Sequence, residues 1–490
     1  MESHLTDPRI VIVGAGPSGL AAGARLLENG LGNISILEAE SRIGGRIHTA
    51  KLGDFNVDLG AQWVHGEEGN VVFELAQPFG LLDKNEHLEQ SFVQEYVDSD
   101  GKFLDEEVVK KFSRFHETFL ENVESSDEEE DDCNLCESIG NYAEKLFYEV
   151  FENNPEIFNE KQKYLHHLEL STISIESTDS WHKLPLNGID EYVDYPGDQM
   201  MNWKDRGYST ALNLLTRSYP DPAQKLPISN KINLNSEVQN IDYSKTHGEN
   251  SIIVATTDAR IFEADHVIVT VPLGVLKERH RNFFIPPLPN NKTRAIEALG
   301  YGNVAKVYLL FNKPFWRLET ERILRYNFMW KDDHRHKVEK TEKEWTLGVL
   351  GAMTVEHKPN ILQLWIAGKY AVMMEKQSED DVLDHSSELL GNFLGQLFKV
   401  ERPTAILRSC WFTNPHFRGT YTHFTVETTK MKISSKMLEE PLNSSNLALL
   451  FAGEATSADR YGTVDGAIRS GWKAADRLLH HYGKVNDVDV

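Results

Sequence analysis

The sequence predicts an α/β protein that starts with a strand–helix–strand unit. Residues 9–16, RIVIVGAG, form a short apolar run ending in glycine, which is typical of a buried parallel strand. Residues 17–30 then show helical spacing and stop at Gly30. Residues 33–40, NISILEAE, have the pattern of a second strand. Together the three segments predict a right-handed βαβ crossover and a parallel sheet.

The middle of the chain predicts a more mixed region. The pattern is irregular from residue 86 to 224, with helical spacing over 106–123. Two stretches between residues 233 and 272 alternate polar and apolar residues as antiparallel strands do. Residues 293–302 predict a helix closed by glycine, and residues 303–311, NVAKVYLLF, predict the strand that follows it.

The C-terminal third predicts a loop, a strand and a helix. Residues 331–345 are highly charged and predict a loop, whereas residues 447–455, LALLFAGEA, predict another buried strand. Residues 466–483 predict an amphipathic helix. The residues near its apolar face are Ile468, Trp472, Ala475 and Leu479.

Composition limits the class of protein. A chain of 490 residues with 40% hydrophobic residues can bury a full core and predicts two domains. We expect no membrane span, because no window approaches 20 consecutive apolar residues, and no secretory signal precedes the first strand. Three cysteines favour a reducing compartment over a disulfide framework. Cys133 and Cys136 form a CxxC pair without a second pair, so we expect no metal site.

The net charge of −24 disfavours nucleic acid and anionic membranes as partners. It is compatible with a cationic ligand, although solubility alone would also account for it. Part of the excess lies in a predicted acidic loop, residues 124–132.

A glycine motif predicts a dinucleotide site. Residues 14–19, GAGPSG, fit GxGxxG and lie between a predicted strand and a predicted helix. Glycines there let the backbone approach a pyrophosphate, and the helix N-terminus offers free N–H groups. Glu38 follows about 20 residues later, where a carboxylate accepts hydrogen bonds from a ribose. A glycine turn used only for packing is the alternative.

The sequence after Glu38 carries a family resemblance. It runs into RIGGR (residues 42–46), and at this point the chain resembles the FAD-dependent amine oxidases. It is most similar to the polyamine oxidases. Matching blocks cover nearly the whole chain: VDLGAQWVHG, GYGNVAKVYLLFNKPFW, LWIAGKYAVMMEK, RSCWFTNPHFRGTYTHF and LLFAGEATSADRYGTVDGAIRSG.

The resemblance implies the flavin amine oxidase fold. In that fold a Rossmann-type FAD-binding domain with a parallel sheet interleaves with a substrate domain of mixed sheet and helices. We expect the FAD-binding domain to comprise residues 1–85, 225–285 and 445–490. The substrate domain would comprise residues 86–224 and 286–444.

The resemblance also implies cofactor-binding residues. We expect FAD to be bound without a covalent link, because residues 455–471 contain no cysteine, whereas related monoamine oxidases attach their flavin through a cysteine in this region. The expected cofactor-binding residues are Gly14, Gly16, Ser18, Gly19, Glu38, Ala39, Gly45, Arg46, Gly60, Ala61, Gln62, Trp63, Val64, Val238, Glu454, Thr463 and Val464.

Lys306 is the first candidate catalytic residue. It stands inside the apolar predicted strand of residues 303–311, where an ammonium is costly to bury unless it is paired or neutral. A lysine reaching to water from a strand edge is the alternative. The resemblance implies that Lys306 holds a water against the flavin N5 atom.

His65, in LGAQWVHGEEG, is the second candidate. The resemblance implies that it donates or accepts a hydrogen bond with the substrate amine, beside a wall formed by Trp63. Glu67 and Glu68 are either surface charges or groups that attract protonated amines. Further substrate contacts implied by looser matches are Glu176, Ser180, Tyr421 and Thr463, with a core aromatic as the alternative for Tyr421.

The function that the resemblance implies is oxidation of a polyamine, either spermine, which we slightly prefer, or an N1-acetylated form. Hydride would pass to FAD N5, the imine would hydrolyse to a shorter amine and an aminoaldehyde, and dioxygen would give hydrogen peroxide. The alternatives are an oxidase of a monoamine, an amino acid or histone lysine, and a catalytically silent flavin- or polyamine-binding protein. We expect a monomer, and the cytoplasm as its location because the terminus NDVDV lacks a peroxisomal SKL-type signal.

Overall fold

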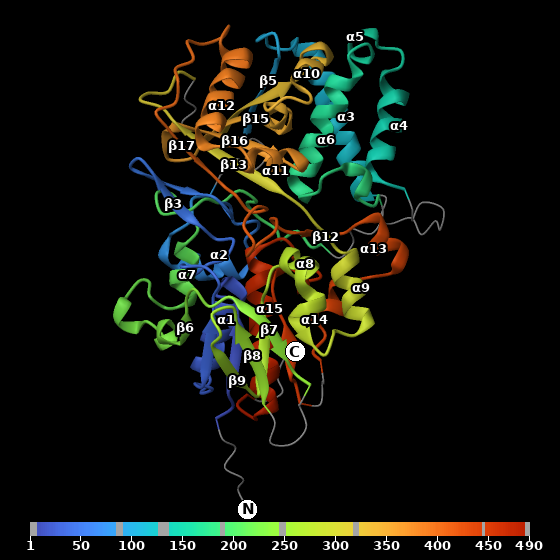
Figure 1. Ribbon diagram of the computed structural model, residues 1–490. Helices are drawn as coiled ribbons and strands as arrows, with labels where there is room; N and C mark the ends of the chain where they lie inside the picture. Colours follow the sequence, from blue (N-terminus) through green and yellow to red (C-terminus); the bar gives the residue numbers. More distant parts are fainter. Residues whose placement is uncertain are drawn as a thin grey trace, which may run out of the picture.

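The computed structural model describes residues 7–84, 92–125, 137–186, 192–244, 251–316, 323–442 and 446–485. Within these ranges the chain is built on two large sheets that occupy the lower and upper halves of Figure 1. Residues 126–132 of the expected acidic loop, together with Cys133 and Cys136, lie outside the described residues. Among the described residues, no helix is long and apolar enough to cross a membrane.

The lower sheet is parallel and confirms the predicted βαβ start. Its strand order is β19 (Leu449–Phe451), β10 (His266–Val269), β1 (Ile10–Val13), β2 (Ile34–Leu37) and β6 (Ile232–Asn233). Helix α1 (Pro17–Glu28) joins β1 to β2, which pair in parallel. The strands other than the edge strand β6 are almost fully buried, as expected of a parallel sheet covered on both faces.

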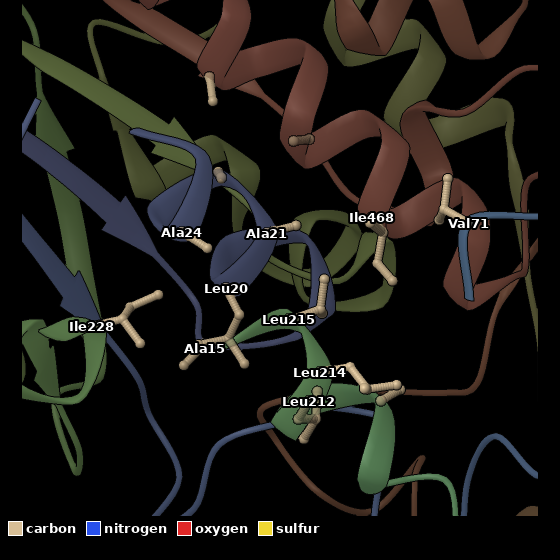
Figure 2. Packing of buried hydrophobic residues seen from close by; sticks show 14 of the residues in the cluster. Ala15, Leu20, Ala21, Ala24, Val71, Leu212, Leu214, Leu215, Ile228 and Ile468 are labelled. Carbon is tan, nitrogen blue, oxygen red and sulfur yellow. The ribbon is translucent and has the colours of Figure 1, made fainter. Parts of the chain in front are cut away.

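Helix α15 (Val464–His481) packs beside α1 on one face of this sheet. In Figure 2, Ala21 of α1 points toward Ile468 of α15. The two helices approach so closely that a Cβ at Gly471 would meet the Ser18 carbonyl oxygen at 2.2 Å. Small residues therefore fix where the N-terminus of α15 lies relative to the glycine turn that precedes α1.

The other face of the parallel sheet carries a four-stranded sheet. Its order is β11 (Phe284–Ile285), β7 (Val238–Asp242), β8 (Ile252–Thr256) and β9 (Ile261–Ala264). The antiparallel pairing of β7, β8 and β9 agrees with the sequence pattern. The prediction was wrong for residues 266–269, because β10 leaves this sheet and pairs in parallel with β1.

The upper sheet is mixed, in the order β17 (Ala405–Arg408), β13 (Val304–Leu310), β16 (Lys358–Ala367), β15 (Val349–Val355), β14 (Ile323–Met329) and β5 (Phe92–Asp98). One face packs on α11 (Lys369–Glu375) and α12 (Glu379–Leu394) through an apolar cluster. The other face meets α3 (Glu106–Ser125), α4 (Ile139–Phe151), α5 (Pro155–Phe158) and α6 (Lys161–Glu176). The predicted strand at 303–311 and the predicted helix at 106–123 are confirmed.

The remaining α-helices and strands are short. They are β3 (Thr49–Leu52), β4 (Phe55–Asp58), α2 (Val71–Ala76), α7 (Thr210–Leu215), α8 (Leu273–Phe283), α9 (Asn290–Ala298), β12 (Gly300–Tyr301), α10 (Asp332–Val338), β18 (Thr422–His423), α13 (Val426–Met431) and α14 (Ser435–Glu439). The loop predicted at 331–345 was wrong, since α10 forms there. Helix α9 begins three residues before its predicted start and ends at Ala298.

Packing crosses the domain boundaries expected from the sequence. Leu212, Leu214 and Leu215 of α7 fall in the range expected for the substrate domain, yet they pack in the α1–α15 cluster (Figure 2). Conversely, Leu52 and Val57 of the β3–β4 hairpin pack against the upper sheet. The boundaries themselves stay a prediction.

Candidate active site

A cavity of about 1320 Å³ extends from the C-terminal ends of β1 and β2 to the upper sheet. It exceeds the roughly 300–1,000 Å³ of a typical small-ligand pocket, so it can hold a large cofactor and a substrate together. Its lining combines residues from all parts of the chain, including the glycine turn before α1, β13, β16 and the N-terminus of α15.

The glycine turn fits a pyrophosphate. Gly14 has a φ of 111°, and a Cβ there would meet Thr270 Oγ1 at 2.5 Å, so only glycine is tolerated. A Cβ at Gly16 would find no atom nearer than the Gly45 Cα at 4.0 Å, so the space between these glycines is open to a ligand. Gly19 does not line the cavity; a Cβ there would clash with the Gly14 carbonyl oxygen at 2.0 Å. Gly19 thus serves the close packing of helix on strand.

Glu38 lies at the end of β2 and lines the cavity beside Ala39. Its two carboxylate oxygens accept hydrogen bonds from the Ala15 N–H at 2.7 Å and the Glu40 N–H at 2.8 Å. Burial raises the pKa of this carboxyl despite these two donors. Each oxygen keeps lone pairs that can accept from a ribose hydroxyl, as the dinucleotide motif requires.

Arg46 and Glu454 form an ion pair inside the cavity lining. Arg46 Nη1 donates to Glu454 Oε1 at 2.8 Å and to the Thr420 carbonyl at 2.5 Å. Glu454 also accepts from the N–H of Gly462 at 2.9 Å and from the side chain of Thr422. Glu454 therefore positions the arginine and the loop before α15, and the arginine supplies positive charge for a diphosphate.

The N-terminus of α15 also faces the cavity. Thr463 is its N-cap; its Oγ1 accepts from the Gly466 N–H at 3.0 Å and donates to the Arg460 carbonyl at 2.8 Å. The hydroxyl is thus engaged in holding the helix end, beside Val464 in the lining. The positive end of the helix dipole favours negative charge at this place.

Lys306 is 4% exposed and extends from β13 into the cavity lining. Its Nζ donates to the carbonyls of Asp58 at 3.1 Å and Gly60 at 2.7 Å, and to Gln62 Oε1 at 2.7 Å. Burial lowers the pKa of this amine to about 7, although the negative charge of Asp58 acts in the opposite direction and raises it. The lysine can therefore gain or lose a proton near neutral pH.

Two tryptophans form a wall next to this lysine. The rings of Trp63 and Trp365 stack with centroids 5.8 Å apart, and Lys306 Nζ lies 5.1 Å from the Trp365 ring centre. Trp63 Nε1 donates to Glu356 Oε1 at 2.9 Å, which fixes the indole orientation. Both tryptophans line the cavity and offer apolar faces to a ligand.

His65 lies in the same lining, on a segment distant in sequence from Lys306. Its Nδ1 is 2.5 Å from the Gln199 carbonyl oxygen, which can only accept, so the proton is on Nδ1. Burial and the nearby Arg460 lower the pKa of the imidazole, which favours its neutral form. A neutral ring in this tautomer leaves Nε2 as a hydrogen-bond acceptor.

Arg460 anchors this segment. It is fully buried, and its guanidinium donates to the Val193 carbonyl at 2.6 Å and the His65 carbonyl at 3.0 Å. Its Nε lies 3.6 Å from Asp465 Oδ2 on α15. The arginine therefore joins the His65 turn to the N-terminus of α15.

Two carboxylates line another part of the cavity. Glu176 is the last residue of α6, Asp194 lies near the start of the described range 192–244, and both belong to the lining. Burial, together with the charge of Asp194, raises the pKa of Glu176 to about 7. Tyr421 lines the cavity nearby and donates its hydroxyl to the Ile175 carbonyl at 3.0 Å. This part of the cavity favours a cation.

Three residues expected at the substrate do not reach the lining. Glu67 pairs with Lys84, and Glu68 is exposed. Ser180 caps a short 3₁₀ helix and donates to Glu169 Oε1 at 3.2 Å. Of the expected cofactor residues, Val64 and Gly19 do not line the cavity. Val64 is buried in the core and forms an isolated β-bridge with Met201.

The other expected residues all belong to the lining. They are Gly14, Gly16, Ser18, Glu38, Ala39, Gly45, Arg46, Gly60, Ala61, Gln62, Trp63, His65, Glu176, Val238, Lys306, Tyr421, Glu454, Thr463 and Val464. Sequence reasoning missed Asp194, Trp365 and Arg325. Only Trp365 carried a signal, because it lies in a block that matched the family. No group of three metal-ligating side chains is found in the described ranges.

Known proteins are similar to this chain over nearly its whole length. The family model described as flavin containing amine oxidoreductase matches residues 17–479. The chain is 30% identical to the peroxisomal N(1)-acetyl-spermine/spermidine oxidases of Bos taurus and Homo sapiens, covering 96% of this chain and 94% and 95% of the two relatives. It is 26% identical to the probable polyamine oxidase 5 of Arabidopsis thaliana, over 97% of this chain and 98% of the relative.

Among solved structures, a similar fold occurs in wild-type putrescine oxidase bound to putrescine. The TM-score is 0.63 at 20% sequence identity, covering 96% of this chain and 99% of the other. This likeness supports the architecture described above.

Proposed function

The chain belongs to the flavin-containing amine oxidoreductases and is an FAD-dependent amine oxidase of the polyamine oxidase family, and on that premise we propose that it oxidises a polyamine at a secondary amine. The observation that carries the proposal is that Lys306 and His65, 241 positions apart in the sequence, line one cavity with the dinucleotide-binding turn. When bound, FAD would supply the acceptor for a hydride from the carbon next to nitrogen and a route for the electrons to dioxygen.

The wall of the cavity suits a neutral amine at the reacting nitrogen. The Nδ1–H of His65 donates to the Gln199 carbonyl, so Nε2 is available to accept a hydrogen bond from a substrate N–H. Trp63 and Trp365 exclude water from the aliphatic chain of the substrate. We propose that His65 positions the amine in this way, while the water-excluding wall of the cavity favours the unprotonated form of the amine.

We propose that Lys306 binds a water molecule in the cavity. A protonated Lys306 uses three N–H groups on the Asp58, Gly60 and Gln62 oxygens. A neutral amine retains two N–H groups and a lone pair, so it can hold a water as donor to that lone pair. A pKa of about 7 makes both forms accessible at the working pH.

Glu176 and Asp194 are proposed to bind a distal ammonium of the polyamine. Their carboxylates converge on the cavity, and a cationic substrate supplies the positive charge that this pair favours. Polyamines carry such charges at a distance from the reacting nitrogen. The cytoplasmic location, the monomeric state and the identity of dioxygen as acceptor are part of the proposal, although the two mammalian relatives are named peroxisomal.

A peroxide assay tests the proposed function. The purified protein is supplied with spermine, spermidine, their N1-acetyl forms and a monoamine. We expect peroxide with at least one polyamine and much less with the monoamine. Turnover of the monoamine alone would support another amine oxidase, and no turnover by the yellow holoprotein would support a silent flavin-binding protein.

We also expect the activity to rise between mildly acidic and mildly alkaline pH. Below pH 7 Glu176 is mostly protonated and cannot pair with an ammonium, whereas above pH 7 it is ionised. The reacting amine also loses its proton as pH rises. Steady-state kcat/KM measured against pH should therefore increase through about pH 7.

The Glu176→Gln variant separates these two effects. It should lower kcat/KM at alkaline pH and remove the part of the rise that belongs to Glu176, while kcat keeps its own pH dependence. A wild-type profile that is flat from acidic to alkaline pH would contradict the picture of a neutral reacting amine.

The flavin should come off the protein on denaturation. Residues 455–471 contain no cysteine, and Cys410, which the structure describes, does not line the cavity. Precipitation with acid should therefore release the yellow colour into the supernatant. Colour that stays with the fully denatured pellet would show a covalent bond.

A further inference from the structure

In addition to Lys306, a guanidinium of the upper sheet lines the cavity. Arg325 of β14 belongs to the lining together with Met353, its partner on β15. Lys306 pairs with Trp365, and Trp365 pairs with Gly351, two residues before Met353. Paired residues in neighbouring strands point to the same face, so Arg325 and Lys306 lie on one face of the sheet. They stand three strand spacings apart, or roughly 14 Å.

The side chains described here around Arg325 are polar but uncharged. Its Nη2 donates to Gln94 Oε1 at 2.9 Å. Burial, and next the charge of Arg325, lower the pKa of His116 on α3 and of His167 on α6, so both imidazoles are neutral. Burial also lowers the pKa of Arg325, but a guanidinium stays protonated in proteins. This end of the cavity therefore carries a positive charge.

The two carboxylates, Glu176 and Asp194, lie at another part of the cavity, near the C-terminal end of α6. His167 interacts with Arg325, whereas Glu176 is nine residues further along the helix, or roughly 13 Å at 1.5 Å per residue. Glu176 and Asp194 face the cavity there. The cavity is thus polarised, with carboxylates near the end of α6 and a guanidinium near β14.

A polarised cavity treats the two ends of a polyamine differently. A terminal ammonium is attracted by Glu176 and Asp194 and repelled by Arg325. An acylated terminal nitrogen carries no charge, and its carbonyl oxygen can accept a hydrogen bond from the guanidinium. A substrate with one ammonium end and one acyl-amide end matches both regions at once.

We infer that Arg325 selects the end group of the substrate: the space beside β14 takes an uncharged acyl amide and disfavours a terminal ammonium. The inference rests on the proposed oxidation of polyamines, and it makes Arg325 a specificity-determining residue. It reverses the slight preference for free spermine that we expected at first.

The test compares kcat/KM for N1-acetylspermine and spermine in the holoenzyme. The wild type should prefer the acetylated form, and Arg325→Met should reduce the ratio of the two values about tenfold or more, mainly through KM. Arg325→Lys keeps the charge and should keep most of the preference. Arg402→Met is the matched control, because Arg402 pairs with Asp384 on the surface and does not line the cavity.

An unchanged ratio in Arg325→Met that retains FAD would overturn the inference. If that variant does not fold, inhibitor binding to the wild-type holoprotein decides instead, read from the perturbed flavin absorbance. A long diaminoalkane should bind more weakly than its mono-N-acetyl derivative, and equal or tighter binding of the diamine would also overturn it. Failure of the proposed function looks different, because the holoprotein would then oxidise neither polyamine.

Discussion

Replacement of Lys306 by methionine should slow flavin reduction or reoxidation roughly 100-fold or more while FAD stays bound. Methionine fills a similar volume but cannot exchange a proton or hold a water. It also removes the lysine donor from the Asp58, Gly60 and Gln62 oxygens, although the Tyr308 hydroxyl still donates to the Asp58 carbonyl and to Gln62 Oε1. Stopped-flow absorbance of the yellow holoprotein, mixed first with polyamine and then with dioxygen, measures the two half-reactions separately.

Lys292→Met is the matched control for this variant. Lys292 is another buried lysine, 1% exposed, whose Nζ donates to the carbonyls of Met437 and Leu438, and burial lowers its pKa to about 8. It does not line the cavity. Its replacement should cost stability, about 1–3 kcal/mol for each oxygen left unpaired, with little change in flavin kinetics. If Lys306→Met gave the wild-type trace, the lysine would have no part in the chemistry.

Replacement of Glu38 by alanine should largely abolish FAD retention. The carboxylate lines the cavity where the ribose is expected and also accepts from the Ala15 and Glu40 N–H groups. A hydrogen bond to a charged group contributes about 1.5–3 kcal/mol, so losing two such bonds to a ribose weakens FAD binding roughly 100-fold or more. The ratio of flavin to protein after gel filtration measures this loss.

Two variants make the result specific. Glu38→Gln keeps an acceptor for one N–H and should retain more FAD than Glu38→Ala. Glu74→Ala removes an exposed carboxylate of α2 that does not line the cavity, and it should retain FAD like the wild type. Full occupancy in Glu38→Ala would show that the ribose is held elsewhere.

Local pattern was sufficient for the elements that interact mainly with sequence neighbours. The unit β1–α1–β2 has short connections, a continuous apolar run and a glycine turn, so its geometry could be predicted. Helix α10 also had a signal that was overlooked. Asp332 and Asp333 stand in its first turn, and Arg335, His336 and Lys337 in its last, which suits the helix dipole.

Strand β10 shows what local pattern leaves undecided. Its residues, HVIV, are all buried, and a continuous apolar run fits a parallel strand better than an alternating one. Its pairing partner β1 is more than 250 residues away, and nothing near β10 in the sequence identifies that partner. The sequence pattern of its antiparallel neighbours therefore led to the wrong assignment.

In the candidate site, too, nearness in sequence and nearness in space differ. Glu67 and Glu68 follow His65 directly, but the chain turns at Gly66, which has a φ of 83°, and Glu67 pairs with Lys84 instead of entering the lining. Nearness in sequence was therefore misleading. Asp194 and Arg325 reach the cavity only through tertiary folding, and isolated charged residues of this kind have no distinguishing motif.

In the proposed function, one cavity brings a polyamine, Lys306 and His65 together at a bound flavin. Anaerobic mixing of the purified yellow holoprotein with spermine and N1-acetylspermine tests this arrangement. We expect rapid loss of the oxidised-flavin absorbance with at least one of the two amines, and recovery with release of peroxide when air is admitted. Flavin that stays oxidised with both amines, in protein that is folded and fully loaded, would contradict it.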